Sequence, residues 1–358
     1  MDLPEAVDNP PRELIDVTDP MDKSASFAFL FFLPILALGL TGYSQERAAG
    51  RMESPVEKPG NDSRFDPGRS TPPTPSENLD FTISKNVDEV NLILSITDMK
   101  GRFVSDLTAG DLKLLDNHTS PEKWNYFQAR TNLPLHVILA VDVSSSIRAR
   151  LHFEQQAAIT FLKRILRRET DKAAIIAFGS NVQEKTPGMT SDTDKLQAEI
   201  RTLQANGETA MYDAIIVSSH KLQESRQHTG VRPVIILITD GDDTASKATL
   251  DAAEEAALRS EATIFALDAN SVYETHPKGR KILDRLTHET GGFVLPAKDY
   301  EDLKGAFSTI EKILRSQYAL GYLPPDLEAN GSFRSIEVTS IKRDLHIHAR
   351  KGYYSPSK

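Results

Sequence analysis

One carboxylate and two hydroxyls at alternate positions have the residue types and the spacing to do chemistry. Asp142, Ser144 and Ser146 form a D-x-S-x-S pattern directly after the apolar run 135–141. This run is rich in β-branched and aliphatic residues, which predicts a buried central strand that ends at Asp142. Apolar residues then recur at helical spacing from Ile147, so the three polar residues are expected in a strand-to-helix loop. Ligands of open α/β sheets bind at this end of the strands.

The D-x-S-x-S pattern has two interpretations. Alternate residues of a tight loop can turn their oxygens toward one point, and hard oxygen ligands suit Mg²⁺, Ca²⁺ or Mn²⁺. In the second interpretation, Ser144 and Ser146 only cap the following helix. The pattern by itself leaves both open.

Two later segments carry polar residues at similar places. Residues 206–215 form a glycine-containing loop that opens a predicted helix, with Thr209 near its start. Residues 234–243 form a second predicted buried strand, which ends in an acidic turn beginning with Asp240. Together with the D-x-S-x-S pattern, these segments resemble the von Willebrand factor A domain family.

The metal-ion-dependent adhesion site of that family is built from D-x-S-x-S, a loop threonine, and a strand-end aspartate followed by glycine. The resemblance covers about residues 133–317 and implies a bound divalent cation, Mg²⁺ first, with Mn²⁺ and Ca²⁺ as alternatives. It further implies a protein partner that completes the coordination with an exposed Asp or Glu. The implied metal ligands are Asp142, Ser144, Ser146, Thr209 and Asp240.

The order of elements predicts the fold class. Strands and helices alternate through residues 133–317, which is typical of an α/β domain with a doubly wound, mainly parallel sheet flanked by helices. Residues 81–132 and 318–355 each predict short strands, too few to close a sandwich separately. We therefore expect them to form one small β-sandwich-like module, with the α/β domain inserted between its halves.

The N-terminal region predicts export. The first 44 residues contain an apolar run, residues 27–40, which is shorter than the roughly 20 residues of a spanning helix and fits a signal peptide. Met21, followed by Lys23, gives a more typical start for such a signal than the acidic segment after Met1. Residues 45–80 are rich in proline, serine and charge, which predicts a disordered linker. The expected location is periplasmic, cell-surface or secreted, with no integral span in the mature chain; a short uncleaved anchor is the alternative.

Composition limits the chemistry. The 358 residues carry a formal net charge of −9, which argues against a nucleic-acid partner. The chain has no cysteine, which excludes disulfides, zinc–thiolate sites and a thiol nucleophile.

The sequence is compatible with three functions. The first is a metal-dependent binding or adhesion module of the cell envelope, in which two carboxylates just balance a divalent cation and leave it electrophilic. The second is a metal-assisted hydrolase, which needs a general base near the metal; the loops of Asp142, Thr209 and Asp240 contain no histidine. The third is a scaffold with a relic metal site. We expect a binding module and no enzyme. His346 and His348 are expected on a polar sheet face, and Asp213 is expected to cap or support the site.

Overall fold

The computed structural model describes residues 89–357, leaving out 130–131, 226–229 and 270–276. The predicted signal peptide, the choice between Met1 and Met21, and the predicted linker all lie outside these residues. In the part of the chain that is described, no helix is both long and apolar enough to cross a membrane.

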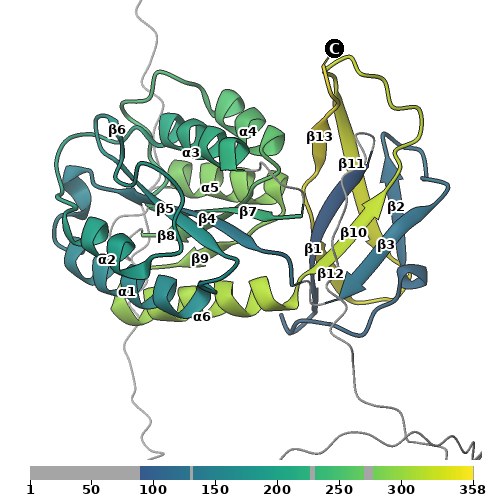
Figure 1. Cartoon of the computed structure of the whole chain (residues 1–358), viewed down its shortest axis with the longest axis horizontal. Coiled ribbons are helices and arrows are strands. Elements are labelled where there is room, and N and C mark those ends of the chain that lie inside the picture. The colour runs from purple at the N-terminus through teal and green to yellow at the C-terminus, as the bar shows by residue number, and fades with distance from the viewer. Residues whose placement is uncertain (1–88, 130–131, 226–229, 270–276, 358) are drawn as a thin grey trace, which may run out of the picture. The chain divides into compact units, whose positions relative to one another are not determined.

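A six-stranded sheet forms the centre of the α/β domain (Figure 1). All neighbouring strands are parallel except β5 and β6. β4 and β7 are buried at every residue, as their apolar runs predict. The doubly wound α/β fold is therefore confirmed. In sheet order, the strands are β6 (Val182–Glu184), β5 (Lys172–Phe178), β4 (Leu135–Asp142), β7 (Arg232–Thr239), β8 (Thr263–Asp268) and β9 (Val294–Pro296).

Three helices cover each face of this sheet (Figure 1). Each helix buries an apolar stripe against the strands, so the sheet separates two hydrophobic cores. On one face lie α1 (Leu151–Ile165), α2 (Thr193–Arg201) and α6 (Tyr300–Ser316), and on the other lie α3 (Met211–Ser225), α4 (Leu250–Arg259) and α5 (Pro277–Thr290).

The helix predicted from Ile147 begins later than expected. α1 starts at Leu151, and residues 145–147 form a 3₁₀ turn (η2) instead. The backbone here is held from outside the helix, because Ser145 N–H donates to the Gly207 carbonyl at 2.9 Å. A tertiary contact therefore overrides the helical periodicity at this point.

Seven strands form two small sheets outside the α/β domain. One sheet has the order β12-β1-β10-β3 and the other β13-β11-β2, and a 3₁₀ turn, η1 (Ala109–Asp111), precedes β2. Their apolar side chains share one core. We call these strands the β module. They are β1 (Val90–Asp98), β2 (Leu112–Asp116), β3 (Trp124–Ala129), β10 (Tyr318–Tyr322), β11 (Phe333–Ser340), β12 (Leu345–His348) and β13 (Gly352–Tyr354).

The α/β domain interrupts the β module in sequence between two neighbouring strands. β3 precedes the domain and β10 follows it, yet the two pair directly, with Ala129 opposite Tyr318. After β1, residues 103–104 form no strand, and a single bridge joins Phe103 to Thr97. There the Tyr318 hydroxyl donates to the Val104 carbonyl at 3.0 Å and accepts from Leu107 N–H at 3.2 Å, which turns the chain away.

Asp116 is the polar centre of the β module. Its carboxylate is fully buried and accepts from the hydroxyls of Tyr322 and Tyr353, each at 2.8 Å. The Arg334 guanidinium donates to its other oxygen at 2.8 Å. Because these partners come from β10, β13 and β11, the carboxylate joins strands of both small sheets.

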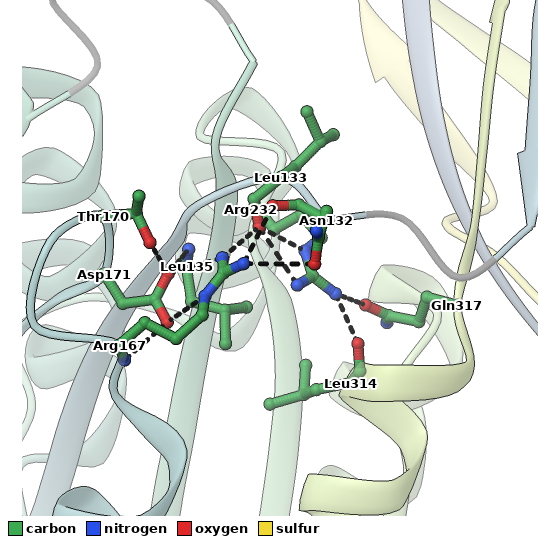
Figure 2. Close-up of polar contacts among 9 residues, drawn as sticks. All are labelled: Asn132, Leu133, Leu135, Arg167, Thr170, Asp171, Arg232, Leu314 and Gln317. Carbon is green, nitrogen blue, oxygen red and sulfur yellow. Dashed lines mark hydrogen bonds and ion pairs between the residues drawn. The ribbon is translucent and has the colours of Figure 1, made fainter. Parts of the chain in front are cut away.

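A second polar network ties together the two places where the chain passes between the module and the α/β domain (Figure 2). Arg232, the first residue of β7, donates through Nε and Nη2 to the Leu133 carbonyl at 3.2 and 3.1 Å. Its Nη1 donates to the Leu314 carbonyl at 2.5 Å and to Gln317 Oε1 at 3.0 Å. One buried guanidinium therefore holds the segment entering β4 and the last turn of α6 together.

The neighbouring Asp171 completes this network. Arg167 donates to both of its oxygens, at 2.9 and 2.8 Å, and Leu135 N–H donates to it at 2.9 Å (Figure 2). Burial, with a smaller contribution from the positive charge of Arg167, lowers the pKa of Arg232 to about 10. Arg232 is nevertheless protonated at neutral pH, so its donors are available to these carbonyls.

His348 of β12 packs its ring on Phe293, which precedes β9, with 4.1 Å between ring centroids. Close by, Lys351 N–H donates to the Glu289 carbonyl at 2.8 Å. Gly291 ends α5 with a φ of +79°, and a Cβ at this position would lie 2.5 Å from the Ala349 carbonyl carbon. The contact between β module and α/β domain therefore requires glycine at this helix end.

We expect the stability of this contact to depend on the charge of His348. Burial lowers its pKa, as do the nearby Lys351, His346 and His288. Neutral His348 therefore stabilises the fold fully above the pKa of about 6.5 of an unfolded histidine, and this stabilisation is lost as the pH falls toward the folded pKa.

The variant His348→Phe keeps a ring on Phe293 and cannot titrate. Between about pH 7 and pH 5, the melting temperature of the parent should fall more steeply than that of the variant. Thermal unfolding followed by circular dichroism measures both slopes, and the exposed His152→Gln is the matched control. Equal slopes in the parent and His348→Phe would contradict the expectation.

Candidate functional site

Asp142 and Asp240 lie at neighbouring strand ends. Asp142 is the last residue of β4, and Asp240 directly follows β7. The two strands are parallel and in register, with Ala140 opposite Leu237, so their carboxyl ends share one edge of the sheet. This register places Asp142 and Asp240 at the same edge of the sheet, as the sequence predicts.

The Asp142 carboxylate is buried and held from two sides. It is 1% exposed. Ser144 N–H donates to one oxygen at 2.7 Å, and the Thr239 hydroxyl donates to the other at 2.9 Å. Its orientation is therefore fixed by its own loop and by the last residue of the neighbouring strand, a support that the sequence analysis missed.

The loop after Asp142 is bonded to the loop that carries Thr209. Asn206 N–H donates to the Val143 carbonyl at 2.6 Å, and Gly207 N–H donates to the Ser145 hydroxyl at 3.0 Å. Thr209 N–H donates in turn to the Thr244 hydroxyl of the Asp240 loop at 3.0 Å. The three predicted segments therefore meet at one edge of the sheet.

The two serine hydroxyls point toward one another. Ser144 Oγ and Ser146 Oγ lie 2.9 Å apart, Ser144 buried and Ser146 exposed. Ser144 occupies the position before the 3₁₀ turn without a side-chain capping bond, and α1 begins after Arg150, also without one. The interpretation in which these serines merely cap the helix is therefore wrong.

Nearby acidic residues support the loops. Asp213 accepts from the backbone N–H groups of Lys247 and Ala248 at 3.1 and 2.9 Å. Asp243 accepts from Tyr212 N–H at 2.9 Å, at the start of α3. Both carboxylates fasten the loop after β7 to the helix after Thr209.

The glycine after Asp240 is needed at this edge. Gly241 has a φ of +85°, and a Cβ on it would lie 2.5 Å from the Gly279 carbonyl oxygen. Only glycine fits this turn without strain.

Comparison with known proteins agrees with this geometry. Residues 137–242 match the family model of the von Willebrand factor type A domain. This segment lies within the α/β domain, which is called the A domain from here on. The match runs from β4 to the acidic turn after β7 and so includes both strand ends described above. No curated protein matches the chain.

Solved structures of low identity are similar to parts of the chain. The conserved hypothetical protein BatB from Bacteroides thetaiotaomicron is 19% identical with a TM-score of 0.42, covering 51% of this chain and 100% of that one. The vWF domain of the type V pili tip protein Mfa5 from Porphyromonas gingivalis is 14% identical with a TM-score of 0.42, covering 51% and 95%. A von Willebrand factor type A protein from Catenulispora acidiphila is 13% identical with a TM-score of 0.44, covering 77% and 76%.

The A domain contains a buried ion pair that the sequence analysis missed. Glu154, in the first turn of α1, is 1% exposed, and its Oε1 lies 3.0 Å from Arg150 Nε. Arg150 Nη1 donates to the Ala269 carbonyl, just past the end of β8, at 2.7 Å. The only signal in the sequence was the i, i+4 spacing of the two charges, which also occurs on exposed helix faces.

The carboxylates of the A domain site repel one another. The pKa of Asp142 is raised to about 6, chiefly by burial and also by the charge of Asp240, against hydrogen bonds from Ser144 and Thr239. The pKa of Glu154 is raised to about 7, chiefly by burial and also by the charges of Asp142 and Asp240, against the charge of Arg150. A cation at this edge would relieve this repulsion.

The donor set suits a hard divalent cation. Two carboxylates and three hydroxyls are oxygen ligands of the kind that Mg²⁺, Mn²⁺ and Ca²⁺ prefer. Among the described residues, no group of three or more His, Asp or Glu is arranged to hold a metal. His346 and His348 of β12 belong to no such group, and the ring of His348 packs on Phe293.

Proposed function

We propose that the A domain is a metal-dependent protein-binding module, which holds a divalent cation and, through it, a carboxylate of a protein partner. Mg²⁺ is the first choice of cation, with Mn²⁺ and Ca²⁺ as alternatives. The observation that carries the proposal is the meeting of three loops at the ends of β4 and β7, where the buried Asp142 is held in place. The proposed ligands are Asp142, Ser144, Ser146, Thr209 and Asp240.

The charge of the ligand set favours an anionic partner. Asp142 and Asp240 together neutralise a divalent cation, and the three hydroxyls add no charge. A bound cation would therefore remain a Lewis acid able to accept an Asp or Glu side chain from a partner. Thr209 lies two residues before α3, whose N-terminal dipole also favours an incoming anion.

A hydrolase is the second candidate, and the site supports it less. Metal-assisted hydrolysis needs a base within hydrogen-bonding reach of the attacking water. The three loops contain no histidine, and the Asp142 oxygens already accept hydrogen bonds from Ser144 and Thr239. A scaffold with a relic site is the third candidate, and it predicts that no Mg²⁺ binds. We also propose that the protein acts outside the cytoplasm, at the cell envelope.

We expect Asp142→Ala and Asp240→Ala each to weaken Mg²⁺ binding at least about tenfold, because each removes half of the charge that balances the cation. Ser144→Ala should weaken binding less, because water can replace a neutral oxygen. Isothermal titration calorimetry measures the affinities, and the exposed Asp194→Ala on α2 is the matched control.

Partner binding is tested by pull-down from an envelope extract with and without chelator. Capture that needs both Asp142 and free Mg²⁺ supports the binding module. Equal Mg²⁺ affinity in the parent and both aspartate variants would refute the site. Metal-dependent hydrolysis of ester, peptide or phosphoester substrates that Asp142→Ala abolishes would favour the enzyme instead.

A further inference from the structure

The Arg150–Glu154 pair lies just behind the candidate cation site. The D-x-S-x-S loop ends at Ser146, Arg150 precedes α1, and Glu154 occupies the first turn of that helix on its buried side. The bond from Arg150 to Ala269 extends from α1 to the end of β8. β8 pairs with β7, and Asp268 lies opposite Thr239, the residue before Asp240.

Hydrogen bonding in this pair is incomplete. Both carboxylate oxygens of Glu154 are buried without a hydrogen-bond partner in the part of the chain that is described, as is Arg150 Nη2. The two groups approach at 3.0 Å but with poor hydrogen-bond geometry. Buried charges with unsatisfied polar atoms cost stability, so a pair kept only for the fold would be better satisfied or replaced by apolar residues.

The pair adds two opposite charges at this edge of the sheet and leaves its net charge unchanged. Asp142, Asp240 and Glu154 carry three negative charges when ionised, and Arg150 carries one positive charge. Their sum is −2, which equals and opposes the charge of one divalent cation. All three carboxylates interact electrostatically, since the charges of Asp142 and Asp240 both act on Glu154.

We propose that Glu154 and Arg150 set the cation affinity of the A domain site from behind it, Glu154 by attracting the cation and Arg150 by limiting that attraction. Neither residue is a metal ligand in this proposal, so both are positioning and charge-setting groups. The inference rests on the proposed function, because it requires that the site binds a cation.

Opposite signs distinguish this role from a structural one. Glu154→Gln leaves Arg150 unpaired beside the site and should weaken Mg²⁺ binding by about tenfold or more. Arg150→Gln leaves the Glu154 charge uncompensated and should strengthen Mg²⁺ binding at about pH 8.5, where Glu154 is more fully ionised. The double variant should return to within about threefold of the parent, since the two charges cancel.

The experiment is calorimetric titration with Mg²⁺ of the parent, both single variants and the double variant. Thermal unfolding in chelator gives the stability of the cation-free protein as a separate readout. Glu311→Gln is the matched control, because Glu311 is also a buried helical carboxylate paired with arginines, Arg164 and Arg315. Arg164 lies at the far end of α1 from Glu154, so this control should leave the Mg²⁺ affinity unchanged.

A purely structural role predicts that both single variants lose stability and weaken Mg²⁺ binding in the same direction. That result, or an unchanged affinity in Glu154→Gln, would overturn the inference while leaving the proposed function intact. A parent protein that binds no Mg²⁺ would overturn both together.

Discussion

Replacing Arg232 with methionine should lower the free energy of unfolding by about 3 kcal/mol, because two buried acceptors lose their donor. These acceptors are the carbonyl of Leu314 and the side-chain oxygen of Gln317, whereas the part-buried Leu133 carbonyl keeps a bond from Arg167 (Figure 2). Methionine fills a similar volume without a charge. The estimate is smaller than the sum over the four lost bonds, since the variant no longer buries a guanidinium.

Urea denaturation measures the change, and Arg315→Met is the matched control. Arg315 lines the same cavity of about 210 Å³ as Arg232, yet it is mostly exposed and forms an ion pair with Glu311. Its replacement should cost less than about 0.5 kcal/mol. A loss below about 1 kcal/mol in Arg232→Met would show that the network does not hold the two chain crossings.

Asp116→Asn should cost about 3–5 kcal/mol, because it leaves the Arg334 guanidinium buried without a counter-charge. The amide also offers one acceptor oxygen where the carboxylate received bonds from Tyr322, Tyr353 and Arg334 on two. Chemical denaturation gives the loss, and near-UV circular dichroism of the tyrosines reports on the β module.

Two further variants test this reason. Asp98→Asn removes an ion pair with the exposed Arg102 and should cost at most about 1 kcal/mol. The double variant Asp116→Asn, Arg334→Met should regain part of the loss, because no buried charge is then left without a partner. A double variant less stable than Asp116→Asn would contradict the explanation.

The sequence predicted the α/β sheet because its central strands are uninterrupted apolar runs. β4 and β7 were predicted to within two residues. Helix starts could not be predicted where tertiary contacts decide them. The helix expected from Ile147 starts later because Ser145 N–H donates to the Gly207 carbonyl. In the β module, pairing between strands on either side of the inserted domain fixes the order, and local patterns carry no information about such partners.

The five proposed ligand positions could be chosen from the sequence because they match the metal-site motif of the von Willebrand factor A domain family. The residues that hold these ligands in place could not be predicted from the sequence. Thr239 is the last residue of an apolar run, and nothing in its position predicts a bond to Asp142. Arg150, Glu154 and Arg232 are charged residues whose spacing also fits an exposed surface. Their burial follows only from the assembled fold.

The insertion between β3 and β10 has a mechanical consequence. The proposed binding edge lies at the carboxyl ends of β4 and β7, while the chain enters at Leu133 and leaves at Gln317, at the opposite end of the sheet. A partner pulling on the site would load both connections in parallel, and they continue into adjoining antiparallel strands, where Ala129 pairs with Tyr318. The two chain connections, joined by the Arg232 guanidinium, would share the tension. The A domain would therefore resist unfolding that starts at a single connection.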